Sequence, residues 1–211
     1  FLQNTIADTA SVYGPCAGAF AMKDWHQALV DTFDVLRGKG CKNNNGVVEK
    51  QVHGYDTWER ESLKNEENPA PQYNLTEKKI LRKYVGGDEC DTEIAFEGRL
   101  VGGCMDCLVN LTGTSFDKVK EFNERYADDG IIWFLESCDL NVFAIRRAMW
   151  QMDNAGWFKN VKGFLIGRPL CYGQEMMGLD QYRAVTGIAA KYNVPVIMDL
   201  SLIHISEPTR H

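Results

Sequence analysis

The sequence predicts an α/β protein with a largely parallel sheet, and two observations carry this prediction. Apolar runs without polar alternation recur in the second half of the chain, as in GIIWFLES (130–137) and VPVIMDL (194–200). Such runs suit strands that are buried on both faces of a sheet. Amphipathic helical segments with short connections alternate with these runs, and that alternation is typical of parallel βαβ units.

The first forty residues contain one strand pattern and one helix pattern. TASVYGP (9–15) is expected to form a short strand that Gly-Pro closes. Four apolar side chains then recur at helical spacing on one face: Trp25, Leu29, Phe33 and Leu36. Gly38 and Gly40 are expected to end this helix.

Residues 41–91 are polar and rich in turn formers, which predicts an extended linker or binding loop with one strand near 47–52. Trp58 and Tyr73 stand out within this segment. Each of these aromatic side chains could pack on the body of the protein or stack on a ligand.

The pattern becomes regular after residue 91. Strands are expected at 94–103, 130–137, 161–169 and 194–200, and helices at 104–113, 117–130, 140–156 and 178–193. Asp139 is the predicted N-cap of the helix at 140–156, and Gly156 lies past its end.

Composition excludes several classes of function. The net charge is −6 and no basic cluster stands out, so no nucleic-acid partner is expected. No run of 18 apolar residues occurs, so no membrane span is expected. Seven scattered cysteines favour buried, reduced thiols in a cytoplasmic protein. CMDC (104–107) has redox or zinc spacing, but no second ligand pair accompanies it, so we expect neither metal nor cofactor.

Three predicted strands end on charged side chains: Glu136, Arg168 and Asp199. Ligands of parallel sheets bind at the carboxyl ends of the strands, so these residues mark a candidate site. Each could instead serve as a helix cap or in an ion pair. Glu136 could be a general acid, a metal ligand or the orienting member of a triad. No G-x-S-x-G elbow occurs, so the residues alone leave the reaction open.

Five segments taken in order are more specific: VYGPCAGAF, EGRLVGGCMDCLVNLTGT, WFLESCDLN, GFLIGRPL and PVIMDL. In this order and spacing the chain resembles the serine peptidase family of LD-carboxypeptidases and microcin C self-immunity proteins, from about residue 1 to 200. The resemblance implies the end of an N-terminal Rossmann-like α/β domain (1–40), a linker and binding loop (41–91) and a C-terminal α/β domain (92–199). It also implies a homodimer of the full-length protein.

The family uses a Ser-His-Glu triad, and the resemblance implies that Glu136 is its glutamate. The triad histidine falls in register with His204, although Ile203 replaces the flanking glycine and Ser201 an acidic residue. Trp58 would stack on a nucleotide base. Arg168, Gly102 and Gly103 would contact a substrate. The expected reaction is hydrolysis of an amide next to a free carboxylate, in a murein-type peptide or a peptidyl-nucleotide antibiotic.

Two departures from the family pattern lead to further expectations. The serine elbow should lie upstream of residue 1, so the chain is expected to be an inactive fragment. LSLIHISEPTR (200–210) resembles a translated sequencing adapter, so residues 200–211 are expected to be foreign to the parent protein.

Two other functions stay open. One is a non-catalytic module that binds a small carboxylate through Arg168, and the other is a thiol-redox protein that uses Cys104 and Cys107.

Overall fold

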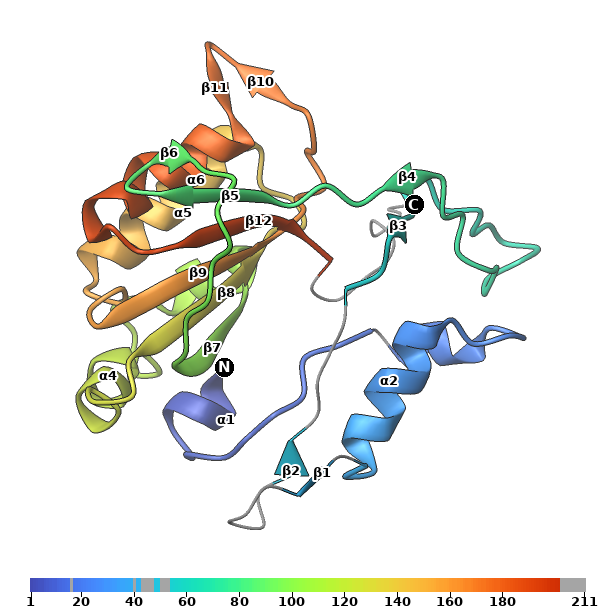
Figure 1. Ribbon diagram of the computed structural model, residues 1–211, viewed down its shortest axis with the longest axis horizontal. Coiled ribbons are helices and arrows are strands. Elements are labelled where there is room, and N and C mark those ends of the chain that lie inside the picture. The colour runs from blue at the N-terminus through green and yellow to red at the C-terminus, as the bar shows by residue number, and fades with distance from the viewer. Residues whose placement is uncertain (16, 40, 43–47, 50–53, 202–211) are drawn as a thin grey trace. The chain divides into compact units, whose positions relative to one another are not determined.

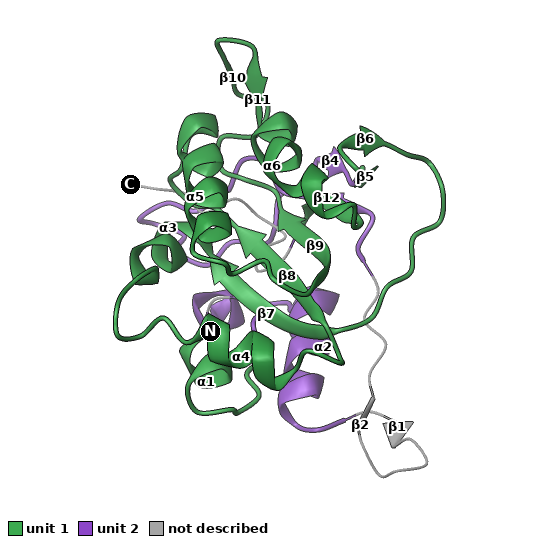
Figure 2. Ribbon diagram, turned by 90° about the vertical axis from the view of Figure 1, so that its left-hand side faces the viewer, with its two compact units in different colours: residues 1–11, 80–200 green, residues 12–79, 201–211 purple. Residues whose placement is uncertain are grey.

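The computed structural model of the chain describes residues 1–15, 17–39, 41–42, 48–49 and 54–201. The chain divides into two compact units (Figure 2). Unit 1 consists of Phe1–Ser11 and Ile80–Leu200, and unit 2 contains Val12–Lys79. The four-part division expected from the sequence stays a prediction.

Unit 1 is built around a six-stranded sheet with the strand order β6-β5-β12-β9-β8-β7 (Figure 1). The strands are β5 (Arg82–Val85), β6 (Asp88–Glu89), β7 (Arg99–Cys104), β8 (Ile131–Glu136), β9 (Val161–Gly167) and β12 (Val196–Leu200). The neighbours β7, β8, β9 and β12 are parallel, whereas β5 and β6 run antiparallel. The predicted α/β class with largely parallel strands is confirmed.

All helices of unit 1 except the first connect these strands. The helices are α1 (Leu2–Thr5), α3 (Met105–Leu108), α4 (Val119–Arg125), α5 (Val142–Asn154) and α6 (Gln181–Ala189), with 3-10 turns η2 (Val109–Leu111) and η3 (Ala190–Tyr192). Helices α5 and α6 pack side by side over the sheet (Figure 1). A hairpin of β10 (Glu175–Met176) and β11 (Leu179–Asp180) projects from unit 1 (Figures 1 and 2). No helix among the described residues has the length and apolar character of a membrane span.

Asn141 is the N-cap of helix α5, and its Oδ1 accepts a hydrogen bond of 2.9 Å from the Ala144 N–H. The prediction of Asp139 as the N-cap is therefore wrong. Both residues are good caps by type, and the Asp139 N–H bonds to Asp106 in the turn that precedes the helix. Gly156 adopts φ 80° just past the helix end, as predicted.

The core of unit 1 lies around β8, in agreement with the interpretation of GIIWFLES as a strand buried on both faces. Trp133 is fully buried, and its ring stacks on Trp157 at a centroid distance of 5.6 Å. Phe158 meets Trp133 edge-on at 5.6 Å. Buried aromatic and aliphatic side chains of this size contribute about 1.5–3 kcal/mol each, so the core holds the carboxyl end of β8 in place.

Three strand expectations differ from the structure. Residues 9–15 form no strand, and the strand predicted at 94–103 begins only at Arg99. The segment predicted as a linker supplies β5 and β6 to the sheet. Strand β5 escaped prediction because Tyr84 is its one buried side chain and two charged residues, Arg82 and Lys83, precede it. Of the strand expected near 47–52, Val48–Glu49 forms β2 against β1 (Cys41–Lys42), and the rest lies outside the described residues.

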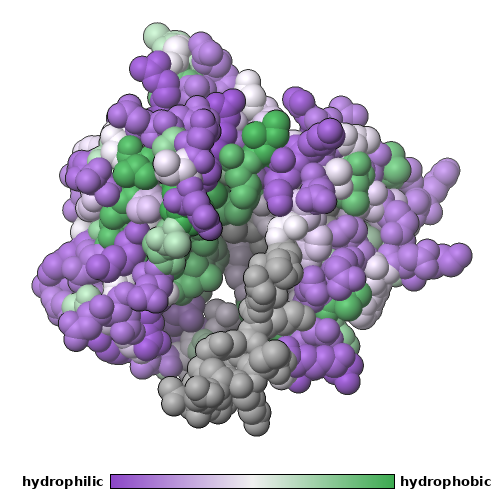
Figure 3. Space-filling view, in the orientation of Figure 1, coloured by the Kyte–Doolittle hydropathy of each residue, from purple (hydrophilic) through white to green (hydrophobic). Residues whose placement is uncertain are grey.

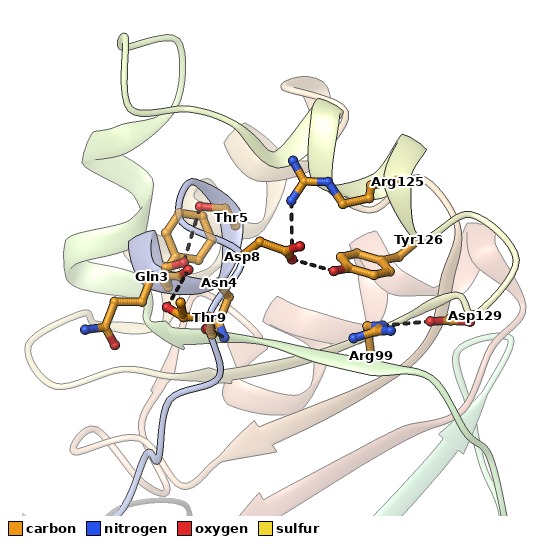
Figure 4. A network of polar contacts seen from close by, with 10 residues as sticks. Gln3, Asn4, Thr5, Asp8, Thr9, Arg99, Arg125, Tyr126 and Asp129 are labelled. Atoms are coloured by element: carbon orange, nitrogen blue, oxygen red, sulfur yellow. Dashed lines mark hydrogen bonds and ion pairs between the residues drawn. The ribbon is translucent and has the colours of Figure 1, made fainter.

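The first eleven residues belong to unit 1 and are tied to it by aromatic and polar contacts. The Phe1 ring stacks on Trp157 at 5.2 Å. Asp8 accepts a hydrogen bond from the Tyr126 hydroxyl and forms an ion pair of 3.3 Å with Arg125 (Figure 4). The Arg99 guanidinium lies over the Tyr126 ring at 3.9 Å. This segment therefore completes unit 1.

Unit 2 holds a 3-10 turn η1 (Ala17–Ala21), helix α2 (Gln27–Leu36) and the strand pair β3 (Thr57–Trp58) and β4 (Glu77–Lys78). The predicted helix is confirmed, and Gly38 follows it at φ 66°. His26 caps α2, because its Nδ1 accepts a hydrogen bond of 3.1 Å from the Ala28 N–H. Burial lowers the pKa of His26. The loop between β3 and β4 is mostly hydrophilic (Figure 3).

Candidate functional site

The candidate site is the edge of the unit 1 sheet at which the four parallel strands end. Strands β12, β9 and β8 are adjacent and parallel. Asp199 in β12, Arg168 directly after β9 and Glu136 at the end of β8 therefore lie along one edge, in this order. The three charged strand ends that the sequence singles out are neighbours in the fold.

Glu136 is half-buried and lies opposite Cys104 in the register of β8 and β7. Burial raises the pKa of the Cys104 thiol to about 12, and the carboxylates of Glu136 and Asp106 add to this shift. Glu136 is therefore close enough to influence the thiol electrostatically. Its carboxylate lies at the carboxyl edge where ligands of parallel sheets bind.

The two cysteines of CMDC have different environments. Cys104 is half-buried with its raised pKa, Cys107 is exposed, and both are free thiols. Redox-active cysteines have a lowered pKa, because the thiolate is the nucleophile. The surroundings of Cys104 therefore disfavour the thiol-redox function. Within the part of the chain that the structure describes, no group of three His, Cys, Asp or Glu side chains is arranged to hold a metal ion.

Asp106 connects the two turns that follow β7 and β8. Its Oδ2 accepts a hydrogen bond of 2.9 Å from the Cys138 N–H, and its Oδ1 accepts one of 2.7 Å from the Asp139 N–H. The Cys104 thiol also donates to Oδ2, at 3.4 Å. One carboxylate thus holds the backbone two and three residues after Glu136.

Asp199 is only 4% exposed and is held by two donors from α6. The Tyr182 hydroxyl donates to Oδ2 at 2.8 Å, and Gln181 Nε2 donates to Oδ1 at 3.1 Å. Burial raises the pKa of Asp199, and these donors and Arg168 counteract part of the rise. Asp199 therefore anchors α6 to the end of β12.

Arg168 is tied to the backbone of β12. Its Nη2 donates to the carbonyl oxygen of Asp199 at 2.9 Å, and its N–H donates to that of Leu200 at 2.8 Å. The guanidinium is half-buried and belongs to the same edge as Glu136. A fixed guanidinium at this position could form a bidentate pair with a carboxylate ligand.

Gly102 and Gly103 lie in β7 and are buried. A Cβ at Gly102 would lie 1.7 Å from the carbonyl oxygen of Phe134, and the residue adopts φ 155°. The close approach of β7 to β8 therefore requires glycine at position 102, for a reason that is independent of any substrate. Contact of either glycine with a substrate stays a prediction.

Trp58 is 4% exposed in β3 of unit 2. Such burial agrees with the alternative that this aromatic side chain packs on the protein, and base stacking by Trp58 stays a prediction. Glu59 beside it is 1% exposed, and its carboxylate accepts a hydrogen bond from the Asn74 N–H. Tyr73 packs edge-on against His26 at 5.7 Å. His204 lies outside the described residues.

The sequence pattern did not single out Asp106, Gln181 or Tyr182, although all three form hydrogen bonds with residues at or next to the ends of the strands in the candidate site. Asp106 follows the Gly-Gly end of β7 by three residues, and an acidic residue in the first turn of a helix is a weak signal. Gln181 and Tyr182 begin α6, and only the fold brings them to the end of β12.

A mostly parallel α/β domain with charged residues at the carboxyl edge of its sheet has the architecture in which ligands bind at that edge. A family model described as the LD-carboxypeptidase C-terminal domain matches residues 97–210, which is more than half of the chain. The chain belongs to this family of peptidases. The match includes residues 200–210, so the expected foreign origin of that segment stays a prediction.

Solved structures share the fold. The microcin self-immunity protein MccF, as a variant in complex with adenosine monophosphate, matches with a TM-score of 0.59, 16% identity and coverage of 92% of this chain and 52% of that one. MccF in complex with aspartyl sulfamoyl adenosine matches with a TM-score of 0.57, 17% identity and the same coverage. Muramoyltetrapeptide carboxypeptidase from Oxalobacter formigenes matches with 23% identity over 59% of this chain and 40% of that one, but its TM-score is only 0.42.

The chain spans about half the length of these solved structures. At such identity the likeness shows the fold alone. No curated protein matches the sequence significantly.

Proposed function

We propose that this chain is part of a serine-type LD-carboxypeptidase-like hydrolase that cleaves an amide bond next to a free carboxylate. The observation that carries this proposal is the meeting of Glu136, Arg168 and Asp199 at one edge of a parallel sheet. Membership of the peptidase family supports the reaction class. The substrate is a murein-type peptide or a peptidyl-nucleotide.

Glu136 is the triad's carboxylate in this proposal. It would accept the Nδ1–H of a histidine, hold the correct tautomer and stabilise the imidazolium that forms during catalysis. Its position at the end of a strand held on both sides by β7 and β9 supports this role, because an orienting group must itself be fixed. His204 falls in register with this histidine, but it lies in the segment expected to be foreign to the parent protein, so the proposal assigns it by register only.

Arg168 would recognise the free carboxylate of the substrate. Its contacts with the β12 backbone hold the guanidinium at the edge, which lowers the entropic cost of binding an anion. The complexes of MccF with adenosine monophosphate and aspartyl sulfamoyl adenosine support a nucleotide-linked substrate. Base stacking by Trp58 stays a prediction of the resemblance, because the side chain is only 4% exposed.

We propose that the chain on its own does not turn over substrate. Ser137 is the serine nearest to Glu136 in sequence, but it is only 4% exposed. A buried hydroxyl next to the orienting carboxylate cannot reach a substrate carbonyl. Residues 54–203 contain no histidine. In this proposal Ser137 is not the nucleophile of the parent enzyme.

The experiment compares the chain alone with the chain fused behind the half of MccF that it does not cover. Each protein is assayed with an LD-tetrapeptide and with a peptidyl-adenylate, and product is followed by mass spectrometry. We expect no turnover from the chain alone and turnover of one substrate by the fusion. Saturable binding of both substrates to a folded fusion without cleavage would instead favour the carboxylate-binding module.

A further inference from the structure

We propose that Asp106 is a positioning residue that fixes the backbone directly behind Glu136. This inference rests on the proposed role of Glu136 as the orienting carboxylate, and it assigns a function to a side chain that the reaction itself does not use.

The contacts of Asp106 concentrate on one short stretch of chain. Its two carboxylate oxygens accept from the N–H groups of Cys138 and Asp139, at 2.9 and 2.7 Å. Hydrogen bonds to an ionised acceptor are roughly twice as strong as those between neutral groups. The pair of contacts therefore restrains both peptide planes, in position and in direction.

Glu136 is consequently held from both sides. On one side, β8 pairs with β7 through Glu136 itself, which lies opposite Cys104, and on the other it pairs with β9 as far as Leu135, opposite Ile166. After it, only Ser137 separates it from the residues that Asp106 holds. Rotation of the Glu136 backbone would break either the sheet or the Asp106 contacts.

Asp106 is itself well placed for this task. It lies in the first turn of α3, directly after β7, and its carbonyl oxygen accepts a hydrogen bond of 2.7 Å from Asn110 Nδ2. The turns after β7 and β8 are adjacent because Cys104 and Glu136 are in register. A displacement of one turn is thus transmitted to the other through a single side chain.

A purely structural role would also connect the two turns, so the test must follow Glu136 itself. We compare the full chain with Asp106→Ala, Asp106→Asn and Asp106→Glu by NMR, and measure amide exchange at residues 138 and 139 and the titration of the Glu136 carboxyl. The Glu variant keeps the charge but lengthens the side chain by one methylene, which separates geometry from charge. Asp180→Asn is the matched control, because Asp180 accepts a backbone N–H from Arg183 at 2.7 Å elsewhere in unit 1.

We expect Asp106→Ala to accelerate exchange at both amides by at least about tenfold. This factor corresponds to the loss of roughly 1.4 kcal/mol at each amide, the free energy of one hydrogen bond. Asp106→Asn retains one acceptor oxygen, so it should expose one of the two amides even if the Ala variant does not fold. Asp106→Glu should shift the Glu136 titration midpoint by more than about 0.3 pH unit. The control should leave this midpoint unchanged.

Unchanged exchange at residues 138 and 139 in the Asn and Ala variants would overturn the proposal. So would a Glu136 midpoint that is the same in Asp106→Glu as in the unsubstituted chain. None of these measurements needs turnover. Failure of the hydrolase proposal would therefore appear in the activity assay alone and would leave the result on Asp106 intact.

Discussion

The hydroxyl of Tyr182 donates a hydrogen bond of 2.8 Å to Oδ2 of Asp199. This contact joins the first turn of α6 to the end of β12, two elements that flank the candidate site. The Arg82 guanidinium of β5 lies over the Tyr182 ring at 4.6 Å. Tyr182 thus connects the helix layer, the last parallel strand and the antiparallel part of the sheet.

Tyr182→Phe is expected to lower the free energy of unfolding by about 1–2 kcal/mol, because a buried carboxylate loses one of its donors. Urea-induced unfolding followed by tryptophan fluorescence measures this loss. Tyr126→Phe is the matched control, since its hydroxyl donates to Asp8 at an exposed position. An equal or larger loss in the control would contradict the importance of burial at Asp199.

The stability of unit 1 should depend on the ionisation of Asp199. Its pKa in the folded protein is raised above the usual 3.8, so folding favours the protonated form. This contribution is complete below the unfolded pKa and is lost as the pH rises through the folded pKa. The free energy of unfolding of the unsubstituted chain, minus that of Asp199→Asn, should therefore fall as the pH rises above the unfolded pKa of 3.8. A difference that grows with pH would contradict a raised pKa of Asp199 in the folded protein.

Gly102→Ala should destabilise the protein by more than about 3 kcal/mol, since the new methyl group would collide with the Phe134 carbonyl oxygen. Gly113→Ala provides the comparison, because Gly113 has φ 74° but no atom within 4 Å of an added Cβ. That variant should lose only about 1 kcal/mol, the cost of a left-handed backbone. Chemical denaturation of both variants distinguishes the collision from backbone strain. Equal losses would mean that β7 can move away from β8.

Alkylation should separate the two thiols of CMDC. Cys107 is exposed, whereas Cys104 is half-buried and has a pKa raised to about 12. Because the thiolate is the reactive form, iodoacetamide at pH 8 should modify Cys107 at least about tenfold faster. Peptide mass spectrometry over time measures the two rates. Faster reaction at Cys104 would instead favour the thiol-redox function of CMDC.

The sequence was sufficient for the central part of the fold. Apolar runs predicted β8, β9 and β12, because strands buried on both faces need apolar side chains throughout. It was insufficient for β5, where pairing with β12 buries only Tyr84. The segment 1–11 could not be assigned to unit 1 from its pattern, since its contacts are with residues more than a hundred positions away, such as Tyr126 and Trp157.

For the candidate site, too, the sequence was sufficient for some residues and insufficient for others. Glu136, Arg168 and Asp199 were recognisable because each ends an apolar run. Their supports were not, since Asp106 and Tyr182 act through contacts that only the tertiary fold creates. Asp199 also proved to be an internal anchor, which no pattern of residue types could have distinguished from an exposed ligand-binding carboxylate.

The most direct test of the account is the effect of Glu136→Gln on hydrolysis by the fusion with the uncovered half of MccF. Gln keeps the shape of the side chain but cannot stabilise an imidazolium, so we predict a loss in kcat of about 10³–10⁴ with little change in KM. Glu124→Gln, at an exposed position of α4, should leave kcat unchanged. A kcat for Glu136→Gln within a few-fold of the unsubstituted fusion would contradict the role of Glu136.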